Sequence, residues 1–96
     1  MSKPAELDPV IHAPARLAIL SILVGAEEAD FTFLRDKLEA TDGNLSTHLS
    51  KLEKAGYVAV RKQFLDRKPN STYRLTEKGR KAFAAYVRAV RSLIDI

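Results

Sequence analysis

The sequence predicts a mainly α-helical domain with one small β-hairpin. Three observations predict it. Apolar residues recur at helical spacing through most of the chain, proline or glycine stands at several expected helix ends, and apolar and polar residues alternate around residues 57–75. At 96 residues the chain suffices for one domain with a modest core, which oligomerisation would stabilise further.

Three segments are expected before residue 26. Residues 1–7 are predicted to form a flexible N-terminal arm. Asp8 followed by Pro9 is a helix-start signal, so a short helix is expected over residues 8–12. A longer helix over residues 14–25 is apolar on nearly every side, and it therefore needs cover from the core and from either the last helix or a second subunit.

Two further helices follow in close succession. Thr32 is expected to cap a helix that runs to about Ala40, and Thr41 is expected to cap the next one. Gly56 ends that second helix, since glycine is the usual residue just beyond a helix C-terminus. Two helices joined by so tight a connection predict a helix-turn-helix.

The second helix of this pair has two contrasting faces. At about 100° per residue, Leu45, Leu49 and Leu52 cluster on one side and are expected to face the core. The opposite side carries short polar and basic residues and no run of acids. A solvated surface helix is the plain alternative, but the hairpin that follows favours a binding role.

A β-hairpin comes directly after this helix. Its strands are expected over residues 57–64 and 71–75, with a tip over 65–70 that holds Arg67 and Lys68. A hairpin that follows a helix-turn-helix is a wing, so the sequence predicts a winged helix-turn-helix.

The last segment, residues 77–96, is predicted to be a C-terminal helix that mediates dimerisation. Thr76 is expected to cap it, and apolar residues such as Phe83 recur on one side at helical spacing. A long terminal helix needs a partner for its second face, and a twofold dimer would supply one. The residues expected at the dimer interface are Val87, Val90, Arg91 and Ile94.

The charge is unevenly distributed along the chain. The net charge is +4, but residues 1–50 contain four Lys and Arg against eight Asp and Glu, whereas residues 51–96 contain twelve against four. A polyanionic partner for the second half would explain this asymmetry, and a well-solvated basic surface is the alternative.

Duplex DNA fits the predicted surface. The second helix of a helix-turn-helix lies in the major groove, where short Asn, Ser and Thr side chains approach bases and phosphates. Lys51 and Lys54 would neutralise phosphates, and Arg67 on a stiff tip suits a narrow minor groove. The predicted DNA-binding residues are Asn44, Ser46, Thr47, Ser50, Lys51, Lys54, Lys62, Arg67 and Lys68.

Three ordered motifs also carry a family resemblance. HAPARLAILSIL, TDGNLSTHLSKLEKAGYV and DRKPNSTYRLTEKGRKAF together resemble small winged-helix transcriptional regulators of the MarR/ArsR-like type, over roughly residues 8–91. The resemblance implies a bacterial or archaeal regulator that binds duplex DNA as a homodimer through its terminal helices. It places DNA contacts on Asn44, Ser46, Thr47, Lys51, Arg67 and Lys68.

Metal and catalytic chemistry are not expected. The chain has no cysteine, and its two histidines, His12 and His48, fall on separate predicted helices, unlike the clustered ligands of metal-sensing relatives. Its glycines form no phosphate-binding loop and its serines no nucleophile elbow, so neither a cofactor nor an enzymatic activity is predicted.

These observations predict a cytoplasmic, sequence-specific regulator that binds double-stranded DNA. Residues 8–76 would form the winged helix DNA-binding domain, acting as a homodimer on a pseudo-palindromic operator and repressing by occupancy. No signal-peptide layout or apolar stretch of membrane-spanning length is present, so no membrane partner is expected. A winged-helix protein–protein interaction module without DNA readout is the alternative, and RNA binding ranks last because aromatic residues for base stacking are lacking.

Overall fold

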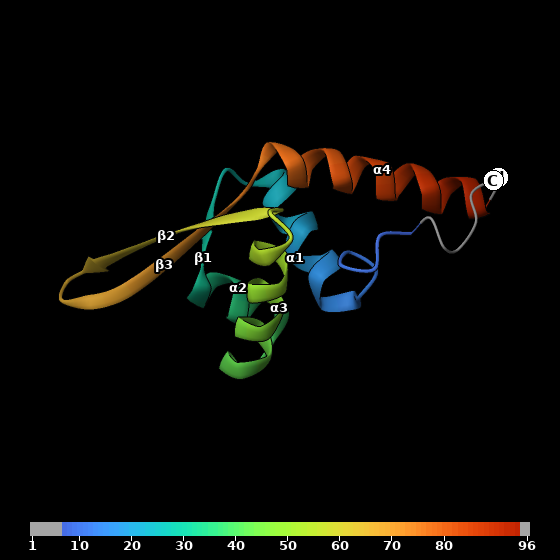
Figure 1. Cartoon of the computed structure of the whole chain (residues 1–96). Coiled ribbons are helices and arrows are strands. Elements are labelled where there is room, and N and C mark those ends of the chain that lie inside the picture. The colour runs from blue at the N-terminus through green and yellow to red at the C-terminus, as the bar shows by residue number, and fades with distance from the viewer. Residues whose placement is uncertain (1–6, 95–96) are drawn as a thin grey trace.

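The computed structural model describes residues 7–94, which form four helices and a three-stranded antiparallel sheet (Figure 1). The predicted winged helix-turn-helix is confirmed. Residues 1–6, which make up most of the predicted arm, lie outside the described residues. The elements are α1 (Pro14–Gly25), β1 (Ala29–Asp30), α2 (Phe31–Leu38), α3 (Asp42–Lys54), β2 (Val58–Leu65), β3 (Lys68–Leu75) and α4 (Glu77–Ile94).

The core lies where α1, α2 and α3 meet. Leu45, Leu49 and Leu52 of α3 are at most 2% exposed, which confirms the predicted inner face of that helix. They pack in one cluster with apolar side chains of α1 and with Leu34 of α2. Burying a leucine side chain fully is worth about 1.5–3 kcal/mol, so these three residues fix α3 firmly to the body.

The two helices of the helix-turn-helix start at different kinds of cap. Thr41 caps α3 as predicted, because its Oγ1 accepts a hydrogen bond from the Asn44 backbone N–H at 3.1 Å. The prediction of Thr32 as the cap of α2 is wrong. Asp30 takes that position, and its carboxylate accepts from the Phe33 N–H at 2.8 Å. A carboxylate caps at least as well as a hydroxyl, so α2 begins before the threonine.

The short helix predicted over residues 8–12 is also wrong, because this segment is a single turn. The His12 N–H donates to the Asp8 carbonyl at 2.7 Å, and the Asp8 carboxylate accepts from the Val10 N–H at 2.9 Å. Ala13, the residue before a proline, is extended with φ −151° and ψ 131°, since that position disfavours helix. The turn nevertheless packs on the body, because Ile11 is fully buried.

The sheet has the order β1-β3-β2, and its hairpin is longer than predicted. The strands pair out to Leu65 and Lys68, so the connection is only Asp66 and Arg67, with φ values of 51° and 65°. Two positive φ angles give the type of two-residue turn that suits the twist of a hairpin. The predicted six-residue tip is therefore wrong. The two-residue strand β1, too short to give a periodic signal, pairs with β3 and was not predicted.

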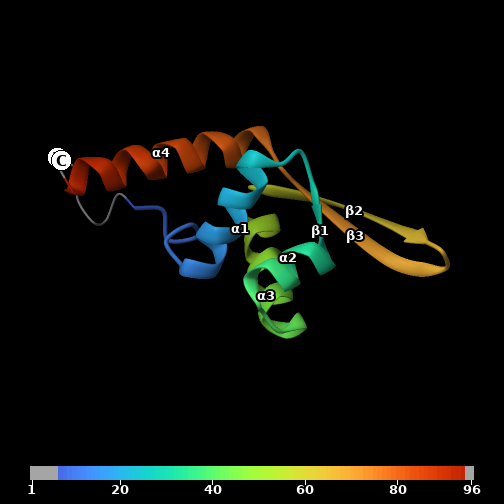
Figure 2. The same ribbon diagram turned by 180° about the vertical axis from the view of Figure 1, so that it is seen from behind.

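Helix α4 begins at the predicted cap and packs on the body through a face that includes part of the predicted apolar stripe, since Phe83 and Val90 lie partly buried against the core. Thr76 Oγ1 accepts from the Gly79 N–H at 2.9 Å, and Gly79, Tyr86 and Ala89 are the buried residues of the helix. A Cβ on Gly79 would lie 2.1 Å from the Tyr57 carbonyl oxygen, so only glycine allows this approach. Seen from behind, α4 starts near the base of the hairpin and runs along the upper edge of the molecule, away from the free end of the hairpin (Figure 2).

Candidate nucleic-acid interface

Helix α3 presents a polar, partly cationic face to solvent. Leucines hold its inner side, and Gly56, with φ 81°, turns the chain away from its C-terminus into β2. The turn is closed by hydrogen bonds of 2.9 Å from the Tyr57 N–H to the Leu52 carbonyl and from the Gly56 N–H to the Glu53 carbonyl. All six α3 residues in the predicted set are exposed: Asn44, Ser46, Thr47, Ser50, Lys51 and Lys54.

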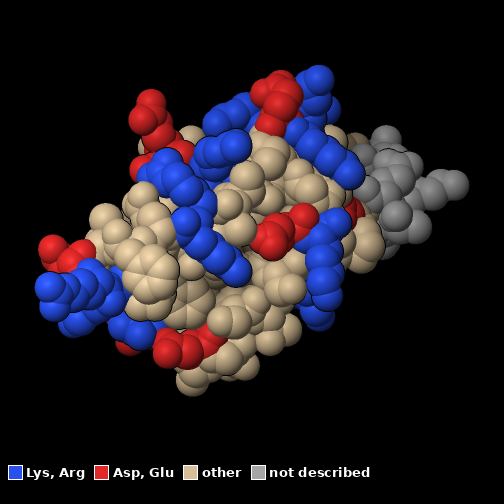
Figure 3. Space-filling model, turned by 60° about the vertical axis from the view of Figure 1, so that its left-hand side comes forward, with Lys and Arg blue, Asp and Glu red and all other residues tan. Residues whose placement is uncertain are grey.

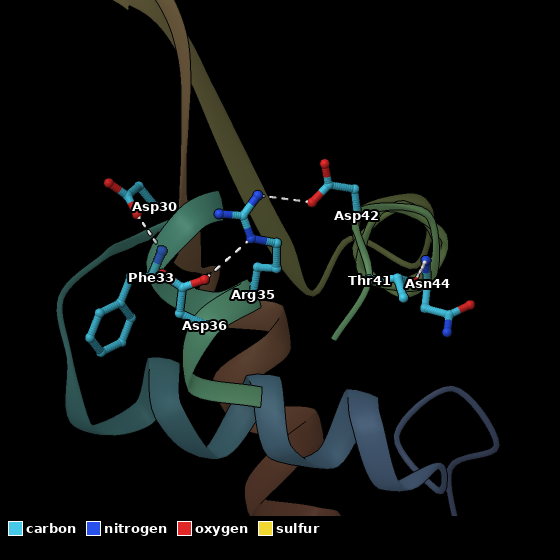
Figure 4. A network of polar contacts seen from close by, with 7 residues as sticks. All are labelled: Asp30, Phe33, Arg35, Asp36, Thr41, Asp42 and Asn44. Carbon is cyan, nitrogen blue, oxygen red and sulfur yellow. Dashed lines mark hydrogen bonds and ion pairs between the residues drawn. The ribbon is translucent and has the colours of Figure 1, made fainter. Parts of the chain in front are cut away.

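The first turns of α3 differ in how free their side chains are. The Thr47 hydroxyl donates to the Gly43 carbonyl at 2.9 Å and so is already engaged with the helix backbone. The Asn44 side chain lies on the outer side of the helix, where it points away from α2 (Figure 4). An asparagine side chain there offers both donors and an acceptor, the pattern that pairs with adenine in the major groove.

A salt-bridge network joins α2 to the start of α3. Arg35 of α2 donates to Asp42 at 3.0 Å and to Asp36 at 3.3 Å (Figure 4). These exposed pairs contribute little to stability. Their effect on the surface is larger, because Arg35 offsets the negative charge that Asp42 would otherwise present next to the exposed end of α3.

A groove separates α3 from the wing, which comprises β2, β3 and the turn between them. Strand alternation puts Lys62 on the same strand face as Val60, toward α3, and puts Arg61 on the other face. Arg61 there pairs with Glu28 at 3.2 Å. The groove is lined by Ser46, Leu49, Ser50 and Glu53 of α3 and by Val60, Lys62 and Tyr73 of the wing.

The structure therefore brings Lys62 together with the polar residues of α3. Burial raises the pKa of Tyr73, the negative charge of Glu53 across the groove raises it further, and a hydrogen bond with Ser71 opposes both. Tyr73 consequently stays neutral and can act as a hydrogen-bond donor at this surface.

Arg67 and Lys68 form a separate group at the far end of the wing. Residues 61–69 are all exposed, and the hairpin projects clear of the helices (Figure 1). When the wing is turned toward the viewer, basic side chains prevail over that face, with a few acidic ones among them (Figure 3). The predicted residues thus form two clusters, one on α3 with Lys62 and one at the tip.

Arg16 is a basic residue near α3 that the sequence analysis did not assign to DNA binding. It lines a shallow hollow with Lys51 and Lys54, next to Pro9 and Val10. Three cations around one hollow can hold a phosphate. Arg16 was noticed only as part of a helix motif, because nothing local in the sequence shows that α1 and the C-terminal half of α3 share this hollow.

The same guanidinium fixes the position of α3. Arg16 donates to the carbonyls of Pro9 and Val10, and one of its terminal nitrogens lies 3.0 Å from His48 Nδ1. Arginine can only donate, so Nδ1 is the acceptor and His48 is neutral in this contact. Burial, and then the positive charges of Arg16 and Lys51, lower the pKa of His48 below 6.5.

The two histidines serve different contacts. His12 Nδ1 lies 2.8 Å from the Tyr86 hydroxyl of α4, whereas His48 contacts Arg16. Tyr57 donates to the Asp8 carboxylate, and this hydrogen bond, with burial and the negative charge of Asp8, raises the pKa of Tyr57 to about 12. Across residues 7–94, His, Cys, Asp and Glu form no group of three that could hold a metal ion.

Taken together, the fold and this surface define a class of protein. A helix held by buried leucines presents polar and cationic side chains beside a basic wing, on a three-helix core closed by a small sheet. This is the arrangement of a winged-helix DNA-binding domain.

The chain belongs to the family described as the winged helix DNA-binding domain, whose model matches residues 15–94. It is 37% identical to an uncharacterised protein from Methanocaldococcus jannaschii over 84 residues, which cover 88% of this chain and 91% of the relative.

Two solved structures extend the comparison. A transcriptional regulator homologue from Pyrococcus horikoshii OT3 is 29% identical with a TM-score of 0.83, over 90% of this chain and 85% of that one. A possible transcriptional regulator for arsenical resistance is 26% identical with a TM-score of 0.68, over 91% and 92% of the two chains.

The protein is therefore a winged-helix DNA-binding transcriptional regulator. Its family and fold are those of such regulators and not of enzymes. Within residues 7–94, no helix is both long and apolar enough to cross a membrane.

Proposed function

We propose that this regulator is a repressor that recognises a specific sequence in double-stranded DNA as a homodimer on a pseudo-palindromic operator. The observation that carries the proposal is the groove in which Lys62 of the wing faces Ser46 and Ser50 of α3. With this arrangement, a single surface of the protein can contact both the edge of a base pair and the phosphates beside it.

Within the proposal, the residues of α3 divide by position. Asn44, Ser46 and Thr47 lie in its first turns, which enter the major groove nearest the bases. Lys51 and Lys54, near the C-terminus of the helix, neutralise phosphates with help from Arg16 in the shared hollow.

The wing extends the contact along the duplex. Lys62 and Ser50 hold the backbone at the edge of the major groove, while Arg67 and Lys68 reach the neighbouring minor groove. Arg67 sits in the turn itself and Lys68 opens β3, so both cations are presented from a short, defined connection.

Helix α4 supports the homodimer. Val87 is half-buried and Ile94 is 56% exposed, so an apolar stripe continues from Val90, which packs partly against the core, toward solvent. Arg91 is exposed on the same side and completes the proposed interface. A twofold axis there would present two copies of α3 about 34 Å apart, one turn of duplex.

Repression follows from occupancy. A dimer that covers an operator excludes other proteins from it without needing a further activity.

Selection of bound duplexes from a random pool tests the proposal. The expected result is an enriched palindrome whose half-sites are about one helical turn apart, roughly 10 base pairs. Transcription in vitro from a promoter that overlaps the selected site should fall as protein is added. A pool with no enrichment, or an enriched site without twofold symmetry, would contradict sequence-specific binding or the dimer respectively.

An Ile94→Glu variant is the control for dimerisation. It introduces a charge into the apolar stripe without touching α3 or the wing. We expect this variant to be a monomer in sedimentation experiments and to lose the preference for two half-sites over one.

A further inference from the structure

The end of the wing carries an apolar cluster that cationic contacts alone do not explain. Phe64 is 75% exposed, more than any other large hydrophobic side chain within residues 7–94, and Leu65, on the opposite strand face, is 50% exposed. Phe64 pairs across the hairpin with Pro69. The cluster lies beyond the core, so its apolar surface does not serve the packing of the domain.

Phe64 lies on the strand face that belongs to the DNA-binding surface. Side chains alternate along β2, so Phe64 shares a face with Lys62 and Val60, and both of these line the groove against α3. Phe64 lies four positions beyond Val60, roughly 13 Å along the strand. The major and minor grooves of a duplex are centred about half of a ~34 Å turn apart. With α3 in the major groove, Phe64 would therefore lie near the adjacent minor groove.

Charge indicates what covers the cluster. Lys62 shares the strand face of Phe64, Arg67 occupies the turn, and Lys68 pairs with Leu65 on the opposite face, against the single acid Asp66. An exposed aromatic ring with Lys62 beside it and Arg67 and Lys68 at the end of the hairpin suits a partner that offers phosphates around an apolar interior. A second copy of the same tip would be repelled by its like charge.

We propose that Phe64 is a wedge that enters the minor groove and packs on a base-pair step, with Lys62, Arg67 and Lys68 on the flanking phosphates. Apolar side chains inserted at such steps partly unstack them and bend the duplex. The two-residue turn limits the motion of the tip and so lowers the entropy cost of inserting the ring. This role rests on the proposed function, and it adds sensitivity to DNA deformability at steps that α3 does not touch.

A single introduced fluorophore tests the wedge. The chain contains no tryptophan, so Phe64→Trp reports only on the wing tip. Phe33→Trp is the matched control, because Phe33 is 51% exposed on α2 and points away from α3 (Figure 4). The probe is a mixed-sequence DNA duplex of about three helical turns, roughly 30 base pairs, at low salt.

Stacking on a base step should quench the emission of the Phe64→Trp protein about twofold or more, while the Phe33→Trp protein changes little. Phe64→Ala should weaken duplex affinity about tenfold and reduce the bend seen by energy transfer between the duplex ends. Urea unfolding of each variant checks that the exposed substitution leaves the fold intact.

The outcomes separate this role from DNA binding itself. If the variants bind the duplex but the Phe64→Trp emission is unchanged, or if only vesicles of anionic phospholipid quench it, the wedge is overturned and the proposed function stands. If the wild-type protein fails to bind the duplex at all, both are overturned.

Discussion

Helix α3 and the wing meet at one groove but are built in opposite ways. The leucines of α3 are at most 2% exposed, and the helix is tied to its neighbours through Arg35 and His48. The wing has no core of its own beyond Val60, since residues 61–69 are all exposed. Its outer half depends on strand pairing and a two-residue turn.

This difference indicates a division of tasks. Base recognition requires side chains held at defined positions, and a helix fixed by buried leucines provides that. A contact between a cationic side chain and a phosphate tolerates small displacements of that side chain. The projecting hairpin does not fix its side chains as firmly as α3 does, but it carries them further along the duplex. We therefore expect the free energy of unfolding to depend on the α3 side of the groove and the salt-dependent affinity for DNA to depend on the wing.

The largest effect is expected from the buried face of α3. Leu49→Ala should lower the free energy of unfolding by about 2–5 kcal/mol, because it leaves a cavity in the core. Phe64→Ala, an exposed wing substitution, should change it by no more than about 0.5 kcal/mol. Urea unfolding measures both, and a comparable loss from the wing substitution would remove the contrast between the two regions.

The root of the wing should show the next largest effect. Gly79→Ala places a Cβ 2.1 Å from the Tyr57 carbonyl oxygen, immediately before β2, and should cost about 1–3 kcal/mol. Gly43→Ala in α3 is the matched control, because its Cβ would meet nothing within 4 Å. That change should raise stability by roughly 0.5–1 kcal/mol. Equal effects at the two glycines would show that α4 does not anchor the wing at this point.

The start of α3 gives a smaller test. Thr41→Ala removes the acceptor for the Asn44 N–H and should cost about 1 kcal/mol, whereas Thr41→Ser keeps it. Hydrogen exchange at the Asn44 amide should speed up in the alanine variant alone. Unchanged exchange there would mean that the cap contributes little to the order of the proposed base-contacting turn.

The smallest effect concerns pH. The folded-state pKa of His48 is below its ordinary value of 6.5, so the unfolded chain binds the proton more tightly. The contribution of neutral His48 to the free energy of unfolding is fully present above pH 6.5. It falls as the pH drops from 6.5 toward the folded-state pKa. His48→Gln should reduce the stability lost between about pH 7.5 and about pH 5, measured by urea unfolding. The control variant, His12→Gln, should lose as much stability over this pH range as the wild-type protein does.

The sequence predicted the helices better than the wing for a physical reason. Helical spacing places Leu45, Leu49 and Leu52 on one face from local information, and the structure confirms it. The hairpin tip was predicted too long because Pro69 and Asn70 are typical of turns, yet pairing between β2 and β3 keeps them in a strand. Asp66 and Arg67 take up the turn through positive φ, which non-glycine residues seldom show.

Long-range contacts account for the rest of what was missed. The sequence predicts each cation near the groove from its own helix or strand, but only tertiary packing puts Arg16 in a hollow with Lys51 and Lys54. The tertiary structure is also needed to establish that the side chain of Lys62, and not that of Arg61, faces α3. Asp30 and Thr32 both have side chains that can cap a helix, so the local sequence leaves two candidates; in the structure Asp30, which pairs with Thr72 of β3, is the cap.

The most direct test is a titration of wild-type, Asn44→Ala and Arg67→Ala proteins across salt, on a selected duplex and on its scrambled counterpart. Asn44→Ala should lose about 1–3 kcal/mol on the selected duplex only, with the salt slope unchanged. Arg67→Ala should weaken both duplexes alike and flatten the slope by about one unit. An equal loss on both duplexes from Asn44→Ala would contradict the claim that α3 reads sequence while the wing supplies charge.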